Sequence, residues 1–413
     1  MNAYLNDVFT IEGKDVEEFI SGLKRIDERT NFHQFNSSEI QILSWDPKLS
    51  DKSDRLGFYL IDPKQMGKFM DQDDPYVPEV VFLSKDRLVD DGMTPEMLTE
   101  LLSATHMMLR TPAGDFFTSC QTVIGTLASR TMLGGDEFFN PDVVRDLMLA
   151  KKLAKQSKPV TFMSRVDGAT QKCFAIHSGT YTPIKQSILG DVIESLKPEL
   201  GTPKVDKWMI DNFMSSIILT FPEKAEEIAD MYELPEKFVP GLYLGTSDTG
   251  ESSITAMGCW IHNGVVSYDA PFKKKHQGDT SAESILKNIE EKIFAKYTKV
   301  PETLEKLLEI DIPIEKLPDV YKAIIEESGL KKALGKKLSK TLQEELVDEV
   351  FTSAKYTAYN VAVTFMDIPQ RLVCSSGFTA SVKLAIEQAA LKAVFCNYER
   401  AIKNAAPTLY LGA

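Results

Sequence analysis

Cysteine is scarce in this sequence, and its spacing argues against two common uses of the residue. The 413 residues include five cysteines, an odd number, and no two of them form a C-x-x-C motif. They lie far apart in the chain, at Cys120, Cys173, Cys259, Cys374 and Cys396. This pattern disfavours a disulfide framework and a zinc knuckle, and it is typical of a protein from a reducing cytoplasm.

Long apolar runs are also missing. No stretch approaches the roughly 18 uncharged apolar residues that a membrane span requires, and residues 1–19 lack a basic start followed by an apolar run. We therefore expect a cytoplasmic protein with no membrane partner. With 43% hydrophobic residues, a chain of this length can still bury a substantial core and is expected to form two to three domains.

Positive charge is in deficit. The chain has 47 Lys and Arg residues against 60 Asp and Glu residues, which gives a net charge of -13. This balance works against non-specific attraction to phosphate backbones. Any nucleic-acid surface must therefore be a local basic patch on an acidic body.

Motifs for nucleotide and acyl chemistry are absent as well. The segment "GLKKALGKK" comes nearest to a phosphate-binding loop, but Gly329 and Gly335 are one residue too far apart, and Lys337 stands where Ser or Thr must hold magnesium. No G-x-G-x-x-G motif follows a predicted strand, and the sequence has neither G-x-S-x-G nor H-E-x-x-H. We therefore expect no cofactor.

One triplet, Asp248-Thr249-Gly250, is shared with aspartic proteases. Those enzymes need two such loops facing each other, so that two carboxylates share one proton. This chain has no second D-[ST]-G, and polar residues flank the triplet. The triplet is more typical of a turn between two strands, "GLYLG" and "SSITAMGCWI".

The patterns along the chain predict an α+β fold. We expect an N-terminal α/β region over 1–139, a strand-rich central region with antiparallel hairpins over 140–280, and a mostly helical C-terminal third over 281–413. Asn140-Pro141-Asp142 has the composition of a helix start. In the central region, Asn263-Gly264 is a strong hairpin signal, because both residues tolerate the positive φ of a type I′ turn.

Two basic segments of the central region are candidates for a nucleic-acid surface. Residues 145–185 carry eight Lys or Arg side chains against two acids, and "FKKKH" follows the hairpin. Lysine side chains bind phosphates, and aromatic rings stack on bases. The two segments would therefore form a nucleic-acid-binding groove if they lay on one face of the protein. The predicted contacts are Arg165, Lys172, Tyr181, Lys185, Phe272, Lys273, Lys274, Lys275 and His276.

A different constellation could hold a metal ion. Asp248, Glu251 and His262 supply the oxygen and imidazole ligands that divalent metals prefer, and they would have to converge across a sheet. This leaves open a metal-dependent enzyme acting on a phosphodiester or a nucleotide. Lone polar residues on strands are more often solvated or hydrogen-bonded than metal-bound.

The order of five short motifs resembles the phage- and plasmid-borne family known as domain of unknown function 932. The motifs are "MSRVDG" with Arg165, "HSGTYTPI" with Ser178 and Tyr181, "GTSDTGESS", "CWIHNGVV" and "KKKHQG". The match covers roughly residues 140 to 280. Two residues separate Cys259 from His262, where the family is often more compact. No catalytic residue can be carried over from this family.

The resemblance implies a context in a bacterial virus or mobile element, in the host cytoplasm, beside genes of replication and recombination. Some such families look like remote members of the single-strand annealing proteins, which assemble into rings and hold DNA along a basic groove. The leading hypothesis is therefore an accessory protein that binds nucleic acid, single-stranded above all, in recombination or replication, as a homo-oligomer and without a nucleotide cofactor; whether it has an enzymatic activity is left open. A virion or host-interaction protein, with the helical third mediating assembly, is the other alternative.

Overall fold

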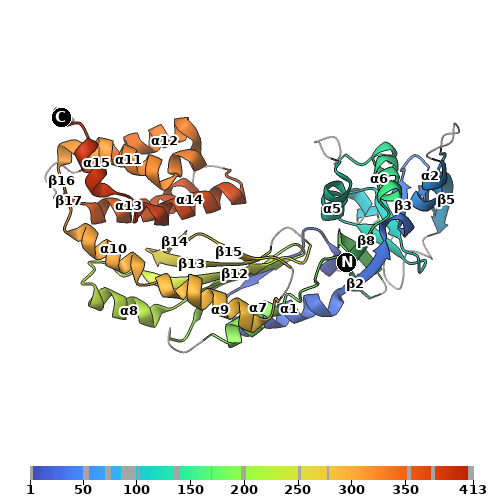
Figure 1. Ribbon diagram of the computed structural model, residues 1–413, viewed down its shortest axis with the longest axis horizontal. Coiled ribbons are helices and arrows are strands. Elements are labelled where there is room, and N and C mark those ends of the chain that lie inside the picture. Colours follow the sequence, from blue (N-terminus) through green and yellow to red (C-terminus); the bar gives the residue numbers. More distant parts are fainter. Residues whose placement is uncertain are drawn as a thin grey trace.

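The computed structural model shows an elongated molecule in which two β-sheets and a helical region follow one another (Figure 1). It describes residues 3–49, 55–69, 76–84, 99–100, 102–133, 140–168, 170–196, 201–249, 253–276, 279–350, 355–373 and 377–407. The α+β fold class is confirmed, because the central sheets are largely antiparallel and the C-terminal part is helical. Within the described residues, no helix has both the length and the apolar character needed to cross a membrane.

The first sheet has eight strands. In spatial order they are β2 (Thr30–Asn36), β8 (Pro159–Asp167), β9 (Thr170–Ser178), β7 (Phe116–Ser119), β6 (Met107–Arg110), β3 (Gln41–Trp45), β4 (Arg55–Ile61) and β5 (Glu79–Ser84). All neighbours are antiparallel except β7 and β9. In β8, residues 160–165 are all buried, because both faces of this strand are covered.

Helices and a hydrophobic core accompany this first sheet. They are α2 (Pro63–Phe69), α5 (Gln121–Thr131), α6 (Val143–Gln156) and the short helices η1 (Ala3–Leu5) and η2 (Ser37–Glu39). The core joins Leu127 and Leu149 of the helices to Phe162 and Phe174 of the strands. The helix predicted at Asn140 begins later than expected, because the Asp142 side chain caps it by accepting from the Val144 amide.

The second sheet has seven strands, all antiparallel. They are β1 (Thr10–Gly13), β10 (Lys204–Asp211), β11 (Ser215–Thr220), β12 (Val239–Thr246), β13 (Ile254–His262), β14 (Val265–Tyr268) and β15 (Phe272–Lys274), with β14 and β15 both paired to β13. The predicted hairpin is confirmed, since Asn263 (φ 48°) and Gly264 (φ 78°) connect β13 to β14. The turn predicted at Asp248 also lies where expected, between β12 and β13.

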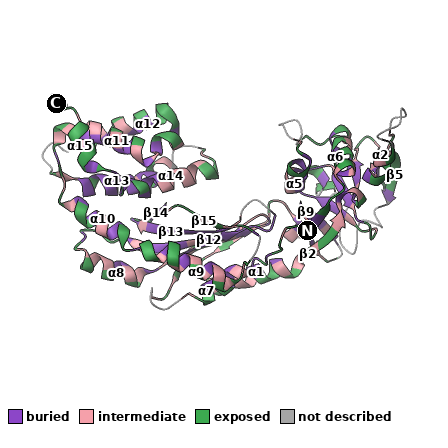
Figure 2. Ribbon diagram, in the orientation of Figure 1, coloured by how far each residue is buried: buried purple, intermediate pink, exposed green. Residues whose placement is uncertain are grey.

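Helices cover one face of the second sheet (Figure 2). The larger apolar side chains on that face belong to the buried core. The helices are α1 (Val16–Arg29), α7 (Ile188–Glu194), α8 (Pro222–Met231), α9 (Ala282–Lys292), η5 (Phe294–Lys296) and α10 (Lys299–Leu308). Trp208, Leu242 and Trp260 point to this face and contact the helices in one continuous core.

The helical region packs on the opposite face of the second sheet, above β14 in Figure 1. It contains η6 (Ile314–Lys316), α11 (Leu317–Ser328), α12 (Leu330–Asp348), α13 (Ala358–Val373), α14 (Ala380–Ala393) and α15 (Tyr398–Asn404), with a two-stranded ribbon of β16 (Asp311–Ile312) and β17 (Tyr356–Thr357). Leu384 of α14 contacts the cluster of Met257 and Tyr268 on the sheet.

The sheets do not follow the boundary predicted at residue 140. Strands β8 and β9 lie within the expected central region, yet they pair with strands from 30–119 in the first sheet. Conversely, β1 near the N-terminus pairs with β10 of the second sheet. The chain therefore crosses between the two sheets twice, after β1 and α1 and again after β9, which local patterns in the sequence do not reveal.

Candidate nucleic-acid interface

The structure brings the two basic segments together. The loop after β9 carries Tyr181 and Thr182, and His276 lies two residues beyond the end of β15. The Thr182 amide donates to the His276 carbonyl at 3.2 Å, and the Tyr181 hydroxyl lies 2.9 Å from Nδ1 of His276. The two rings are stacked, with centroids 5.2 Å apart. Contacts between residues 95 positions apart thus join the two segments.

Arg165 lies beneath this junction, fully buried at 0% exposure. Its Nη2 donates to both carboxylate oxygens of Asp248, at 2.9 and 3.1 Å, and its Nη1 donates to the Asn212 carbonyl and side chain at 2.8 and 2.7 Å. The guanidinium also lies over the Phe174 ring, 4.7 Å from its centroid. Arg165 therefore joins β8 of the first sheet to two loops of the second.

The Asp248 carbonyl extends the same network to two rings. It accepts a hydrogen bond from Nε2 of His177 at 2.8 Å and another from the Tyr181 hydroxyl at 3.2 Å. With its proton directed at Asp248, the Tyr181 oxygen accepts from Nδ1 of His276. His177 stacks on Tyr181 with ring centroids 3.8 Å apart, so the tyrosine contacts two imidazoles.

Burial sets the protonation of these groups. Desolvation lowers the pKa of His177 to about 4, although hydrogen bonding and the charge of Asp248 oppose the shift. Desolvation also lowers the pKa of His276 and raises the pKa of Tyr181. All three rings are therefore neutral at pH 7, and Arg165 and Asp248 are the charged pair at the centre. Sequence reasoning missed His177, since nothing in "AIHSG" marks its ring as Tyr181's stacking partner.

Several predicted contacts are not available to a polyanion. Arg165 is buried, and Lys172 is 1% exposed with its Nζ 2.7 Å from Asp7. The Tyr181 ring stacks on His177 with centroids 3.8 Å apart, so that face of the ring is not available to a base. Arg165 and Lys172 therefore hold neighbouring segments together, because their buried charges already have partners.

Successive side chains of β15 point to opposite faces of the sheet, so the residues of the second basic segment lie on two different faces. Phe272 packs against the core below the sheet, and Nζ of Lys292 lies 4.4 Å from its ring centroid. Lys274 points to the same side, where its charge adds to hydrogen bonds from Ser281 in lowering the pKa of Asp279. Phe272 is thus not free to stack on a base. Lys273 points to the opposite face, because strand side chains alternate.

The predicted contacts that remain exposed are three lysines. Lys273 and Lys275 flank the ordered junction on one side, and Lys185 lies three residues after Thr182 on the other. They stand on segments joined by the Tyr181 and His276 contacts. We refer to Lys185, Lys273 and Lys275 as the lysine rim.

The structure does not bring the alternative metal ligands together. His262 lies at the far end of β13, where it contacts Glu236 and lies 2.9 Å from Asp367, whereas Asp248 lies beyond the opposite end of β12. The eight residues of β12 alone span roughly 26 Å at about 3.3 Å per residue. Glu251 lies outside the described residues. Among the residues that are described, no group of His, Cys, Asp and Glu side chains could hold a metal ion.

Comparisons with known proteins return no relative. No family model matches the chain, and neither a curated protein nor a solved structure matches it. The resemblance to the domain of unknown function 932 therefore stays a prediction, and the functional argument depends on the geometry of the lysine rim and its buried support.

Proposed function

We propose that this protein binds single-stranded nucleic acid at the lysine rim. The observation that carries the proposal is the direct contact between Tyr181 and His276, which joins two basic segments that lie far apart in the sequence. Three exposed ammonium groups on adjoining segments match the charge of a phosphate backbone. Binding of this kind needs no nucleotide cofactor, since it releases counterions and involves no chemical step.

A single strand suits this surface better than a duplex. The protein carries a net charge of -13, so the attractive surface is small and is surrounded by an acidic body. A rigid duplex extends its phosphates beyond a small patch, whereas a flexible strand can bend away from the acidic surroundings. The buried network beneath the rim holds its two segments in place before binding, which lowers the ordering cost of association.

The test is fluorescence anisotropy of a labelled single-stranded DNA, with duplex DNA in parallel. The variant Lys185→Glu/Lys273→Glu/Lys275→Glu removes the rim and should weaken binding by at least about a hundredfold, because attraction is replaced by repulsion. Its matched control is Lys151→Glu/Lys152→Glu/Lys155→Glu, which changes the net charge equally at three exposed positions of α6. The control should retain most of the affinity.

Two results would contradict the proposal. Absence of binding to both DNA forms at low salt would remove the nucleic-acid function and favour the virion or host-interaction alternative. Equal losses in the two triple variants would mean that net charge, and not the lysine rim, determines binding. We do not propose a metal-dependent enzyme, since Asp248 and His262 lie at opposite ends of their strands.

A further inference from the structure

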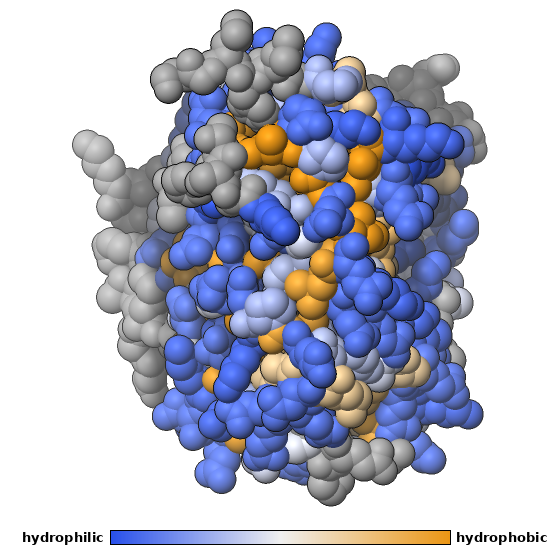
Figure 3. Space-filling model, turned by 90° about the vertical axis from the view of Figure 1, so that its left-hand side faces the viewer, coloured by the Kyte–Doolittle hydropathy of each residue, from blue (hydrophilic) through white to orange (hydrophobic). Residues whose placement is uncertain are grey.

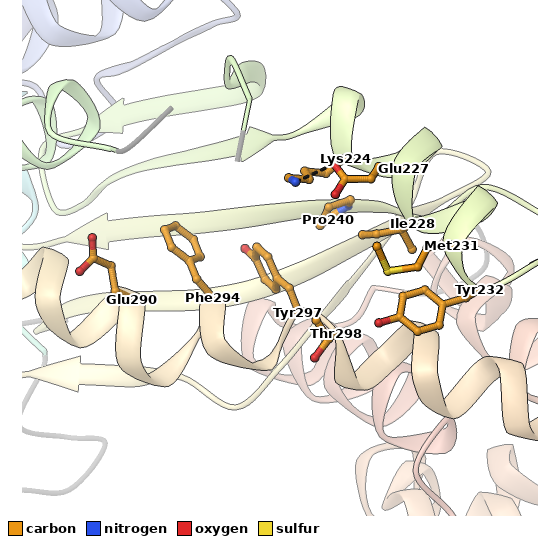
Figure 4. A pocket seen from close by; sticks show the side chains of 10 residues that line it. All are labelled: Lys224, Glu227, Ile228, Met231, Tyr232, Pro240, Glu290, Phe294, Tyr297 and Thr298. Atoms are coloured by element: carbon orange, nitrogen blue, oxygen red, sulfur yellow. Dashed lines mark hydrogen bonds and ion pairs between the residues drawn. The ribbon is translucent and has the colours of Figure 1, made fainter. Parts of the chain in front are cut away.

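A pocket of about 470 Å³ opens between α8 and the turn at η5, beneath the second sheet (Figure 4). Its walls are mainly apolar. Ile228, Met231 and Tyr232 line it from the α8 side, and Phe294 and Tyr297 line it from the other. Met231 is 62% exposed, and exposure of so large an apolar side chain at a pocket mouth is typical of a binding surface. We call this pocket the socket.

Carboxylates outnumber ammonium groups in the lining of the socket. Its lining includes Glu227 and Glu290, and its one lysine, Lys224, is paired with Glu227 at 2.6 Å. Desolvation and the charges of Glu302 and Glu305 raise the pKa of Tyr232, which shows that these carboxylates act at the mouth of the socket. A complementary partner would present an apolar side chain among positive charges.

The chain carries such a feature on α12. Gly335 has φ 77° and ψ 170°, which interrupts the helix, and the four residues 335–338 are all exposed. The last of them, Leu338, is 43% exposed. Lys336 and Lys337 precede it and Lys332 lies one turn earlier, and within the described residues no ion pair engages these three lysines. We call Leu338 with these lysines the knob.

We propose that the knob of one copy of this chain docks into the socket of a second copy. Leucine would enter the apolar pocket while the lysines face its carboxylates, so the two surfaces are complementary in apolar character and in charge. In Figure 1, α12 lies at the top of the helical region and α8 lies below the sheet. Two different surfaces therefore meet, and such a heterologous contact repeats from copy to copy into a ring or an open chain.

The end of the molecule that carries α8, α10 and α15 also exposes apolar surface. Figure 3 looks onto it and shows apolar side chains gathered in a band between hydrophilic ones. Apolar surface flanked by charge is the usual anatomy of a protein interface.

Sedimentation velocity of the full chain, without nucleic acid, tests the proposal. The unmodified protein should form species larger than one chain as its concentration rises. Leu338→Glu blocks the knob and Met231→Glu blocks the socket, and each should weaken self-association by more than about tenfold, because a carboxylate would enter an apolar, acidic pocket. Val144→Glu replaces an exposed apolar residue of α6 and should leave assembly unchanged.

Mixing the two blocked variants gives the sharpest result. Each retains one intact partner surface, so the mixture should form a dimer of one copy each and nothing larger. A monomeric unmodified protein, or single variants that assemble normally, would overturn the proposal. Assembly of the Lys185→Glu/Lys273→Glu/Lys275→Glu variant should be normal, so failure of this contact and failure of nucleic-acid binding are separate outcomes.

Discussion

Arg165 is predicted from the sequence to contact nucleic acid, but in the structure it belongs to the buried network beneath the lysine rim. Its guanidinium makes four hydrogen bonds to Asp248 and Asn212 and is fully buried. Removing one partner of a buried ion pair is far more damaging than replacing both, because it leaves a desolvated charge. Residues of this kind fix the lysine rim without contacting a ligand.

We expect Arg165→Leu to lower the free energy of unfolding by about 3–5 kcal/mol, because the Asp248 carboxylate remains buried without its cation. Urea denaturation measures the loss. The control is Lys237→Ala, which breaks an ion pair exposed on both sides and should leave the free energy of unfolding almost unchanged. The double variant Arg165→Leu/Asp248→Leu should lose less unfolding free energy than Arg165→Leu alone. If Arg165→Leu lost no more than the control variant, the structural role of Arg165 would be refuted.

His177 makes stability depend on acidity. Its pKa is about 4 in the folded protein and near 6.5 when unfolded, so the unfolded chain takes up a proton first as the pH falls. The stabilising contribution is complete above pH 6.5 and is lost between there and about pH 4, by up to about 1.4 kcal/mol per pH unit. His177→Gln keeps a donor for the Asp248 carbonyl and should show a flatter profile in urea titrations from pH 7 to 5. An unchanged slope would contradict this assignment.

At the scale of elements, single backbone positions determine which surfaces the helices and strands present. The three residues of β15 direct Lys273 to one face and Phe272 to the other, which separates a candidate contact from a core residue. In α12, the conformation of Gly335 is one that side-chain-bearing residues rarely adopt, and it exposes the knob.

Two glycine-to-alanine substitutions should therefore change the stability of the protein in opposite directions. Gly335→Ala forces a strained backbone and should destabilise the protein by about 1–3 kcal/mol, although open space surrounds the new methyl group. Gly125→Ala lies inside α5, also with open space, and should stabilise by about 0.5–1 kcal/mol through higher helix propensity. Thermal unfolding of both variants measures the difference. A stabilising Gly335→Ala would mean that α12 is a continuous helix.

At the scale of the whole molecule, the buried network couples the two sheets. Arg165 from the first sheet is bound by loops of the second, and the lysine rim lies above that junction. The helical region occupies the opposite end of the second sheet, where the knob lies. Nucleic-acid binding and self-association are thus assigned to surfaces that do not share residues.

Local features could be predicted from the sequence, and long-range pairings could not. The hairpin at Asn263 and Gly264 follows from the φ preference of two adjacent residues. By contrast, Arg165 and Asp248 are 83 positions apart, and only the tertiary structure shows that a basic residue is buried against an acid. The sequence indicates that the two basic segments could form one surface, but it does not show that they meet. Which side chains of β15 point to each face depends on the register of the strand in the sheet.

The most direct test of the central claim is the salt dependence of single-stranded DNA affinity. For single strands, the slope of log affinity against log salt is roughly -0.7 per phosphate neutralised. The variant Lys185→Gln/Lys273→Gln/Lys275→Gln should therefore reduce the magnitude of the slope by about two, with the chain still folded. An unchanged slope in this variant would contradict the assignment of the lysine rim as the nucleic-acid contact.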